Sequence, residues 1–562
     1  MNIDASAQLK SLLEKPPLIV KIEVQIPTSE ELASLRLWLH DVLTFEIEDA
    51  GSSDSLTQVD TPREIASTCA HMIAAALREF LQLVQLPVFD RIPVVSIDVN
   101  AMAPANVVLS IAIPAMHHLP TSIYRYVLRF TMETCLWMLR VTPNDANKVM
   151  LFDSITEKLH SVLAKHIFST QSTMQVLRAA HAMGIPFLHL GVGVYQLGWG
   201  SKARRMDRSI TELDSFLGAR LSQNKQATAA LLRMGGLPAP IHQLIGKETQ
   251  LISAANEIGF PIVVKPSDKD RGEGVTVDIF DPKSLQKAYQ LALDISPSKQ
   301  VIVERQVEGI CHRLFIANGS MLYALKRWPM LVVGDGRQTV EALVDNEVEL
   351  QNSLVPWCRS GILPIDDLAL IELRRLGLDT DSIPAEGERV SLRRVESGAW
   401  GGIDEDVAAT IHPANVSIAI RAAELFGLNI AGIDIITPDI AVPWFDNGAI
   451  INEVNLSPSF GVGEISRRHI PVFLQQFIQD NGEIPIELFD GEQGLALSDA
   501  RQAELREQGL RCFSTSATRT LDYQQIELVM PLDRLQDRVT ALLCRPDVDA
   551  LLIISDASIT SG

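Results

Sequence analysis

Residues 431–455 read AGIDIITPDIAVPWFDNGAIINEVN, and this stretch decides the fold of the chain. Two apolar runs, Ile430–Ile436 and Ala449–Val454, lie on either side of a segment that contains proline and asparagine. Short apolar runs separated by turn-forming residues are typical of adjacent β-strands. The stretch therefore predicts two neighbouring strands joined by a turn, and the rest of the chain is interpreted outward from them.

Three polar side chains interrupt these two runs. Asp434 lies within the first run, and Glu453 and Asn455 lie two residues apart at the end of the second. Residues i and i+2 of a strand point to the same face, so Glu453 and Asn455 project together and Asp434 can face them. Two carboxylates and an amide oxygen suit a hard cation such as Mg²⁺, although acids at strand ends are also commonly just solvated.

Length and composition restrict the class of protein. The chain has 562 residues, of which 47% are hydrophobic, so several domains with their own cores are expected. The formal net charge of -20 opposes a main role in binding nucleic acid. Six cysteines form no CxxC pair. The first residues, MNIDASAQLKSLLEKPP, lack the apolar core of a signal peptide, and no apolar run is long enough to span a membrane. We therefore expect a cytoplasmic protein that binds neither nucleic acid nor a membrane.

Before residue 165 the sequence alternates helix-like and strand-like patterns. Helices are predicted at Ala66–Val84 and Tyr124–Leu139, and strands at Ile92–Val99 and Val107–Ile113. No catalytic motif is recognisable there. This part of the chain predicts an N-terminal α+β domain.

Candidate phosphate-binding residues follow in the next third of the chain. Lys225 opens a predicted helix, and Lys265 ends a short predicted strand within PIVVKP. The loop SDKDRGEGV comes next and contains Gly272 and Gly274. Glycines let backbone N–H groups approach phosphates and a lysine adds a point charge, although most glycine-rich loops are only turns.

Further strands carry arginines between this loop and the opening stretch. Val301–Glu304 predicts a strand that leads into two more, with Arg313 on the second of the three. The segment RVSLRRVESGAWGG places Arg393 and Arg394 in a predicted strand before a glycine-containing loop. A predicted helix, Asn415–Phe426, then delivers the chain to residues 431–455.

The order of these motifs resembles the ATP-grasp fold, and five segments narrow the resemblance to the cyanophycin synthetases. They are VYQLGWGSKARR, VIVERQVEG, VVGDGRQTVEAL, IHPANVSIAIRAAELFGLNIAGIDIITPDI and INEVNLSPSF. The resemblance covers residues 160–480 well and the first 150 residues loosely. It implies a multidomain α+β / α/β chain with an N-terminal α+β domain (1–165), an ATP-grasp ligase domain (166–485) and a Mur-ligase-like region (486–562).

The last of these regions departs from the family pattern. The family continues with a P-loop for a second ATP, but the printed sequence contains no GxxxxGK[ST]. The segment RPDVDALLIISDASI still resembles a strand-forming part of a Mur-ligase core. We expect a degenerate, truncated remnant, as in the second type of cyanophycin synthetase. That type polymerises β-aspartyl-arginine dipeptides into cyanophycin at one ATP-grasp site, through an acyl phosphate, with ATP and Mg²⁺; a homodimer is also expected.

The resemblance also assigns roles to single residues. Contacts to ATP are implied for Lys225, Lys265, Gly272, Gly274, Glu304 and Glu308. Mg²⁺ ligands are implied at Asp434, Glu453 and Asn455. Catalytic roles are implied for Arg313 and Arg393 at the transferring phosphoryl group and for Ser215 at the acceptor end of the polymer. Ser215 can equally be a helix cap, and Arg313 a surface ion-pair partner.

Several positions near the expected substrate differ from the family. Cys311 occupies the place of an acid that contacts the ATP ribose in the family, and Glu308 and His312 are the candidate substitutes for it. The glycine-rich loop reads Arg-Gly-Glu-Gly rather than His-Gly-Arg-Gly, and Lys326 replaces an acid. Two alternatives therefore stay open: an ATP-grasp ligase that joins other amino acids or a small peptide, and a non-catalytic protein that binds the polymer or a synthetase.

Overall fold

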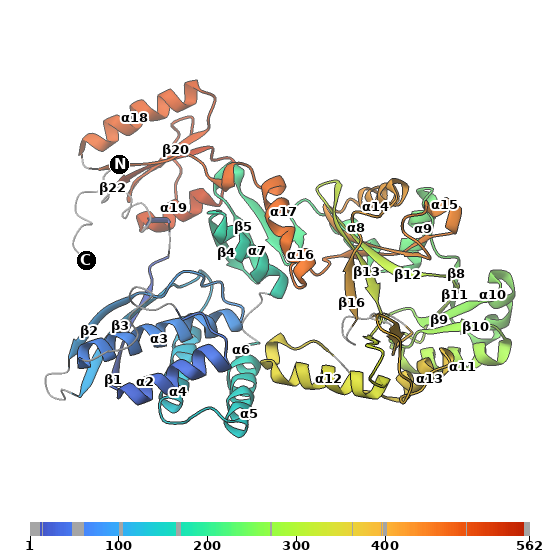
Figure 1. Ribbon diagram of the computed structural model, residues 1–562. Helices are drawn as coiled ribbons and strands as arrows, with labels where there is room; N and C mark the ends of the chain where they lie inside the picture. The colour runs from blue at the N-terminus through green and yellow to red at the C-terminus, as the bar shows by residue number, and fades with distance from the viewer. Residues whose placement is uncertain are drawn as a thin grey trace. The chain divides into compact units, whose positions relative to one another are not determined.

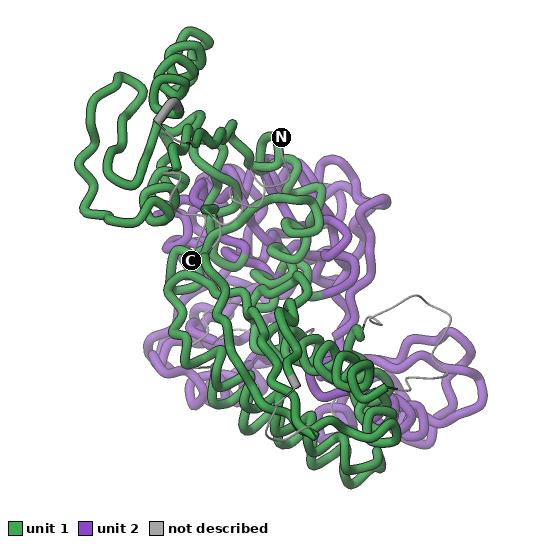
Figure 2. Tube along the Cα trace, turned by 90° about the vertical axis from the view of Figure 1, so that its left-hand side faces the viewer, with its two compact units in different colours: residues 1–208, 460–462, 470–562 green, residues 209–459, 463–469 purple. Residues whose placement is uncertain are grey.

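The computed structural model describes residues 12–13, 15–47, 61–99, 105–164, 170–269, 273–361, 364–394, 396, 402–490 and 492–555. The chain forms two compact units (Figures 1 and 2). Unit 1 comprises residues 1–208, 460–462 and 470–562, and unit 2 comprises residues 209–459 and 463–469. Both units combine helices with sheets, which confirms the predicted mixed class. The predicted domain boundaries at residues 165 and 485 stay predictions.

Unit 1 begins with a three-stranded antiparallel sheet that two long helices accompany. The strand order is β1 (Leu18–Gln25), β3 (Asn106–Ile113), β2 (Val94–Val99). Helices α3 (Pro62–Leu83) and α4 (Thr121–Met138) bury an apolar stripe each, which is why helical periodicity predicted them. The predicted strands and helices of this region are confirmed to within a few residues.

The C-terminal part of unit 1 is a second, mostly parallel sheet. Its order is β19 (Ile486–Asp490), β22 (Ala550–Ser555), β20 (Cys512–Thr515), β21 (Thr520–Leu521). The strand β22 confirms the strand predicted in RPDVDALLIISDASI. The other main elements of unit 1 are α2 (Ser29–Leu37), α5 (Asp145–Ser154), α7 (Gln171–Ala182), β4 (Phe187–Gly191), β5 (Val194–Leu197), β6 (Arg204–Asp207), α17 (Ile470–Phe477), α18 (Glu492–Glu507) and α19 (Leu535–Leu543).

Unit 2 contains a four-stranded antiparallel sheet with helices on one face. The strand order is β10 (Thr276–Ile279), β9 (Ile262–Pro266), β11 (Val301–Arg305), β8 (His242–Ile245). Helices α10 (Leu251–Ile258) and α11 (Pro282–Ile295) cover one face of it and close an apolar core (Figure 1). Side chains alternate along each strand, so the residues between the core positions point to the other face.

A five-stranded antiparallel sheet in unit 2 contains residues 431–455, for which two neighbouring strands were predicted. Its order is β16 (Ile403–Asp406), β13 (Ser320–Trp328), β12 (Ile310–Ala317), β17 (Ile430–Thr437), β18 (Ile450–Leu456). Helices α9 (Lys225–Met234) and α14 (Pro413–Phe426) contribute to the core on one face. The predicted pair of strands is confirmed, with the short helix α15 (Trp444–Asn447) in the connection.

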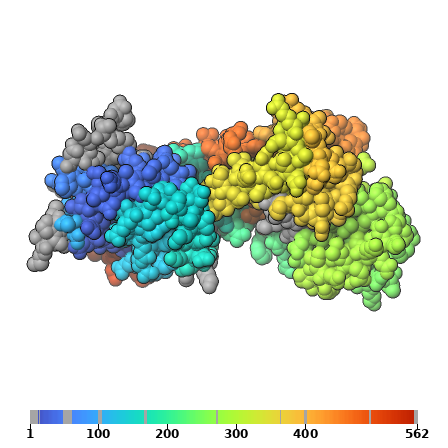
Figure 3. Space-filling model, turned by 60° about the horizontal axis from the view of Figure 1, so that its bottom comes forward, coloured from blue at the N-terminus to red at the C-terminus, as the bar shows by residue number. Residues whose placement is uncertain are grey.

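A small lobe follows β13 within unit 2. It consists of the antiparallel pair β14 (Leu331–Val333) and β15 (Arg389–Ser391) with helices α12 (Val340–Ser353) and α13 (Asp367–Arg375) around a core of their own. Most side chains of α12 are at least partly exposed, and its atoms form part of the yellow surface in Figure 3. The remaining helices of unit 2 include α8 (Phe216–Ser222) and α16 (Glu464–Arg468).

Among the helices of the described ranges, none is both long enough and apolar enough to cross a membrane.

Candidate active site

The register of the five-stranded sheet places three charged side chains in one row. Arg313 on β12 lies directly opposite Asp434 on β17, and Asp434 lies directly opposite Glu453 on β18. Directly opposite residues of antiparallel strands project to the same face. The opposite face packs against α14 through residues such as Leu314 and Ile433, so the charged row occupies the face that this helix leaves open.

Arg313 and Asp434 form a bidentate ion pair. Both distances, from Arg313 Nε and Nη2 to the two carboxylate oxygens of Asp434, are 2.7 Å. Only 4% of the Asp434 side chain and 20% of the Arg313 side chain are exposed. Burial alone would lower the pKa of Arg313, but the adjacent Asp434 carboxylate raises it above its ordinary value. The pair therefore holds a permanently charged guanidinium in a fixed orientation on this face.

Asn455 and Glu453 lie beside Asp434, and each carries a side-chain oxygen that can ligate a cation. Asn455 donates from Nδ2 to Asp434 Oδ2 at 3.1 Å and to the Gly432 carbonyl at 3.3 Å. Glu453 and Asn455 are both half-buried and share one face of β18. Each carboxylate oxygen has two lone pairs, so Asp434 can keep Arg313 and still ligate a cation. The three residues fit Mg²⁺, which takes few carboxylates together with water and phosphate oxygens.

A cluster of three or more His, Cys, Asp or Glu side chains with metal-binding geometry does not occur in the described part of the chain. The predicted set contains only two such side chains, because its third member is an amide. A site of this kind has a low affinity for a free cation and relies on ligand phosphates to complete the coordination.

The second group of predicted residues lies on the four-stranded sheet. Lys265 on β9 donates from Nζ to Glu304 Oε1 on β11 at 2.7 Å. Both residues are buried, with 9% and 7% of their surface exposed. The other carboxylate oxygen of Glu304 is buried and has no hydrogen-bond partner in the described residues. The structure thus joins two residues that the sequence analysis assigned separately to ATP.

The remaining ATP-binding predictions lie in loops and at a helix start. Lys225 is the first residue of α9 and donates from Nζ to the Lys269 carbonyl at 2.6 Å. Gly274 has a φ of +72°, and an added Cβ would lie 2.9 Å from Pro266, so the turn after β9 requires glycine there. Glu308 is exposed in the loop between β11 and β12. Gly272 lies outside the described residues.

Arg393, one of the predicted catalytic residues, bonds to residues of the small lobe. Arg393 is only 3% exposed, donates to Asp366 at 2.8 Å and to the Leu392 carbonyl at 2.8 Å, and so belongs to the small lobe. The prediction that Arg393 and Arg394 lie in a strand is wrong, because β15 ends at Ser391, opposite the start of the three-residue strand β14. The Arg393 side chain instead bonds to Asp366, the N-cap residue of α13.

Ser215 is the N-cap residue of α8. Its hydroxyl accepts a hydrogen bond from the Gly218 N–H at 3.1 Å, and its own N–H donates to the Gly427 carbonyl at 2.9 Å. The helix-cap alternative raised for Ser215 is therefore what the structure shows. The expected role at the acceptor end of a polymer stays a prediction.

Sequence reasoning missed charged residues beside the central row. Arg327 on β13 lies opposite Asp404 on β16, with Nε and Oδ1 4.0 Å apart. Burial raises the pKa of Asp404, while Arg327 acts to lower it. Cys311 is buried near Asp434 and Glu396, and burial followed by these carboxylates raises the pKa of its thiol. The alternation of β12 and β13 is a signal that could have placed Arg327 on the face of Arg313.

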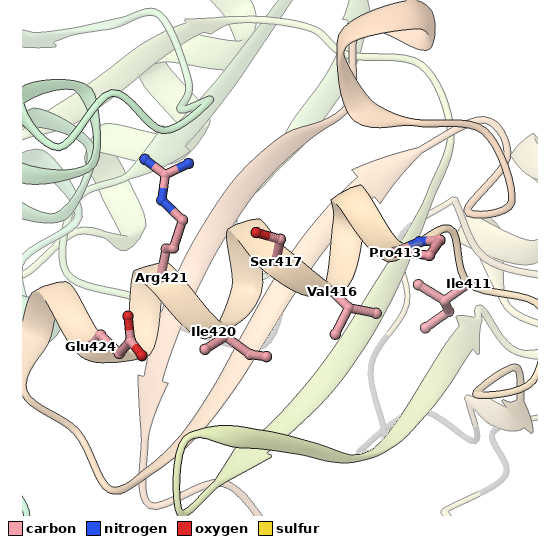
Figure 4. Close-up of a pocket in the computed structure, with 7 residues that line it drawn as sticks. All are labelled: Ile411, Pro413, Val416, Ser417, Ile420, Arg421 and Glu424. Atoms are coloured by element: carbon pink, nitrogen blue, oxygen red, sulfur yellow. The ribbon is translucent and has the colours of Figure 1, made fainter.

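A surface depression of about 500 Å³ lies elsewhere, along the outer side of α14 (Figure 4). Its lining residues are Ile411, Pro413, Val416, Ser417, Ile420, Arg421 and Glu424. None of the predicted site residues lines it. The depression is therefore separate from the residues that the sequence assigned to ATP and Mg²⁺.

Comparison with known proteins supports the resemblance inferred from the sequence. The cyanophycin synthetase of Geminocystis herdmanii is 35% identical over 298 residues, which are 51% of this chain and 33% of that protein. The cyanophycin synthetase of Crocosphaera subtropica is 36% identical over 293 residues, again 51% of this chain and 34% of the relative. The match thus covers about a third of the length of these curated relatives.

The chain was also compared with family models and with solved structures. No family model matches the chain. A bifunctional glutathione synthetase from Pasteurella multocida aligns in structure with a TM-score of 0.43 and 19% identity, over 72% of this chain and 60% of that protein. The predicted resemblance is confirmed at the level of sequence: over about half of its length, this chain is similar to cyanophycin synthetases.

Proposed function

We propose that unit 2 is an ATP- and Mg²⁺-dependent ligase that joins a carboxylate to an amine and forms a peptide bond. The observation that carries this proposal is the row Arg313–Asp434–Glu453, in which one cation and two carboxylates lie side by side on the sheet face opposite α14. Similarity to cyanophycin synthetases supports it. A binding protein has no need for such a row, so a catalytic role is favoured over the non-catalytic alternative.

The residues of unit 2 have distinct tasks in this proposal. ATP supplies the phosphoryl group that activates the carboxylate, with an acyl phosphate as the expected activated form. Lys225 and Lys265 neutralise phosphate charge, and Arg313 stabilises charge that develops on the transferred phosphoryl oxygens. Asp434 fixes the orientation of Arg313 and, with Glu453 and Asn455, would hold Mg²⁺. Positioning and electrostatics therefore account for most of the expected catalysis.

We further propose β-aspartyl-arginine as the incoming amine and the C-terminal carboxylate of a cyanophycin chain as the acceptor. One ligation site forms one kind of bond, and repeated addition of a dipeptide needs only one kind. Ser215 and Arg393 keep their proposed roles at the acceptor end and at the phosphoryl group. A homodimer is proposed as the assembly, and light scattering after gel filtration measures it.

The test is ATP-dependent phosphate release by the purified full chain with Mg²⁺ and a cyanophycin primer. One sample receives β-aspartyl-arginine, and another receives aspartate and arginine as separate amino acids. Turnover with the dipeptide alone, accompanied by growth of insoluble polymer, is the expected result. Turnover only with other amino acids or peptides would refute the dipeptide but keep the ligase.

A matched pair of variants controls this assay. Glu453→Gln removes one carboxylate from the row, whereas Glu424→Gln removes one from the outer side of α14. At a limiting Mg²⁺ concentration, strongly reduced turnover in the first variant and normal turnover in the second are expected. No ATP turnover by the wild-type chain with any amine tested would refute the proposed ligase.

A further inference from the structure

Three polar side chains occupy the face of the four-stranded sheet that its helices do not cover. Ile245, Val264 and Val303 point into the core with α10 and α11. The alternate residues His242, Lys265 and Glu304 therefore point to the opposite face. Because β11 lies between β9 and β8, Glu304 is flanked by Lys265 on one neighbouring strand and by His242 on the other.

Only one of the two carboxylate oxygens of Glu304 has a hydrogen-bond partner among the described residues. Lys265 Nζ occupies Oε1 at 2.7 Å, but Oε2 is buried and lacks a hydrogen-bond partner among the described residues. Only 7% of Glu304 is exposed. A buried acceptor left unpaired is costly, and native structures contain few of them. The free oxygen therefore indicates a place where a donor from a ligand is received.

His242 presents a second unpaired atom on the same face. It lies directly opposite Glu304, and its Nε2 is buried without a partner in the described residues. Burial lowers the pKa of His242, Glu304 acts to raise it, and Lys265 and Arg233 lower it further. The imidazole is therefore neutral near pH 7, so that Nε2 can donate or accept according to its tautomer.

Apolar side chains surround these polar atoms. Val263 and Ile302 project to the same face and are 8% and 0% exposed. Apolar side chains with a few polar atoms among them are the usual composition of a small-molecule site. Across this face, the ammonium group of Lys265 offers positive charge to the phosphate end of a nucleotide.

We propose that His242 is a specificity residue for the nucleotide, and that it reads the amino edge of adenine together with the free oxygen of Glu304. This inference rests on the proposed function. Adenine carries a donor, its exocyclic amine, next to ring nitrogens that accept. The carboxylate oxygen receives the amine, and the Nε2–H tautomer of His242 donates to N1, which accepts in adenine but carries a hydrogen in a 6-oxo purine. A purine with an oxo group at the same position offers a second acceptor to Glu304 and is disfavoured.

The test compares the binding of ATP and of inosine triphosphate, in which an oxo group replaces the amine. Dissociation constants are measured by calorimetry for the full chain and for His242→Ala, with Mg²⁺ present. The wild-type chain is expected to prefer ATP. The variant is expected to reduce the ratio of the two affinities about fivefold, as the loss of one net hydrogen bond predicts.

Two more variants separate recognition from a structural role. His242→Gln keeps a side-chain donor and is expected to restore part of the preference. Gln243→Ala changes the next residue, which faces α10 and bonds to Glu257, and is expected to leave the preference unchanged. If His242→Ala does not fold, the comparison of His242→Gln with the wild-type chain still measures the effect.

The outcomes distinguish the inference from the proposed function. Equal ATP preference in the wild-type chain, His242→Ala and His242→Gln would overturn the inference, because water would then satisfy the two buried atoms. The ligase proposal would stand in that case. Absence of nucleotide binding by the wild-type chain would overturn both, whereas a reduced ATP preference confined to the His242 variants supports the inference.

Discussion

Replacing Glu453 by glutamine separates the catalytic use of the charged row from its contribution to stability. Glu453 lies directly opposite Asp434, so two carboxylates face each other at adjacent positions. Arg313 bonds to Asp434 through both of its oxygens, and Glu453 acts on Arg313 only through longer-range attraction. Glutamine keeps the size of the side chain and removes one of the two like charges.

The expected change in stability is small because two effects oppose each other. Like charges at directly opposite positions of a sheet cost up to about 1 kcal/mol, and the variant relieves this repulsion. It also loses some attraction to Arg313, which has its own carboxylate in Asp434. We therefore expect the free energy of unfolding of Glu453→Gln to stay within about 1 kcal/mol of the wild-type value.

The expected change in activity is large. An Mg²⁺ site with two carboxylates loses half of its protein charge, so the Mg²⁺ concentration for half-maximal phosphate release should rise at least about tenfold. The comparison variant is Asp434→Asn, which leaves a buried guanidinium without its partner. That variant should lose activity and also about 3 kcal/mol of stability.

The assays are urea denaturation and Mg²⁺ titration of phosphate release, both at fixed ionic strength. An unchanged Mg²⁺ dependence in Glu453→Gln would refute the assignment of Glu453 as a metal ligand. A loss of stability as large as that of Asp434→Asn would refute the argument that Arg313 depends mainly on Asp434.

Three further predictions concern the framework around the site. Lys265→Met leaves the Glu304 carboxylate buried without a cation and should lower the free energy of unfolding by about 3 kcal/mol in urea denaturation. Gly309→Ala, at a φ of +124° with Thr437 backbone atoms 2.1 Å from the added Cβ, should cost roughly 2–3 kcal/mol, and a neutral result would contradict the clash. Because burial lowers the pKa of His242 below its ordinary 6.5, the unfolded chain binds more protons near pH 6, and stability should fall as the pH drops below about 6.5. His242→Gln should lack that part of the slope in denaturation curves at several pH values.

Local patterns were sufficient to predict the strands and helices of unit 2 that carry the central charged row. The run Ile430–Ile436 became β17, and the helix predicted at Asn415–Phe426 is α14 with two more residues at its start. Apolar runs and a 3.6-residue periodicity indicate which side chains are buried, and this pattern of burial distinguishes strands from helices. The grouping of Asp434, Glu453 and Asn455 also followed from alternation along single strands.

Register and distant partners could not be predicted in the same way. The pairing of Arg313 with Asp434 spans 121 positions of sequence, and the pairing of Lys265 with Glu304 spans 39. No pattern in one strand states which residue of another strand lies opposite it. Arg393 shows the same limit, because its sequence context does not indicate that it bonds to Asp366 within the small lobe.

The buried ion pair of Lys265 with Glu304 explains why the free oxygen of Glu304 matters for the proposed reaction. Lys265 is bound to Glu304 as long as no phosphate competes for it. If Lys265 turns to a phosphate, the buried Glu304 carboxylate loses its only recorded donor, which is strongly unfavourable. A donor supplied by the same ligand offsets this cost, and the exocyclic amine of adenine is such a donor. Release of Lys265 and recognition of the base are thereby coupled, so a nucleotide without the amine should bind less tightly at the phosphate end as well.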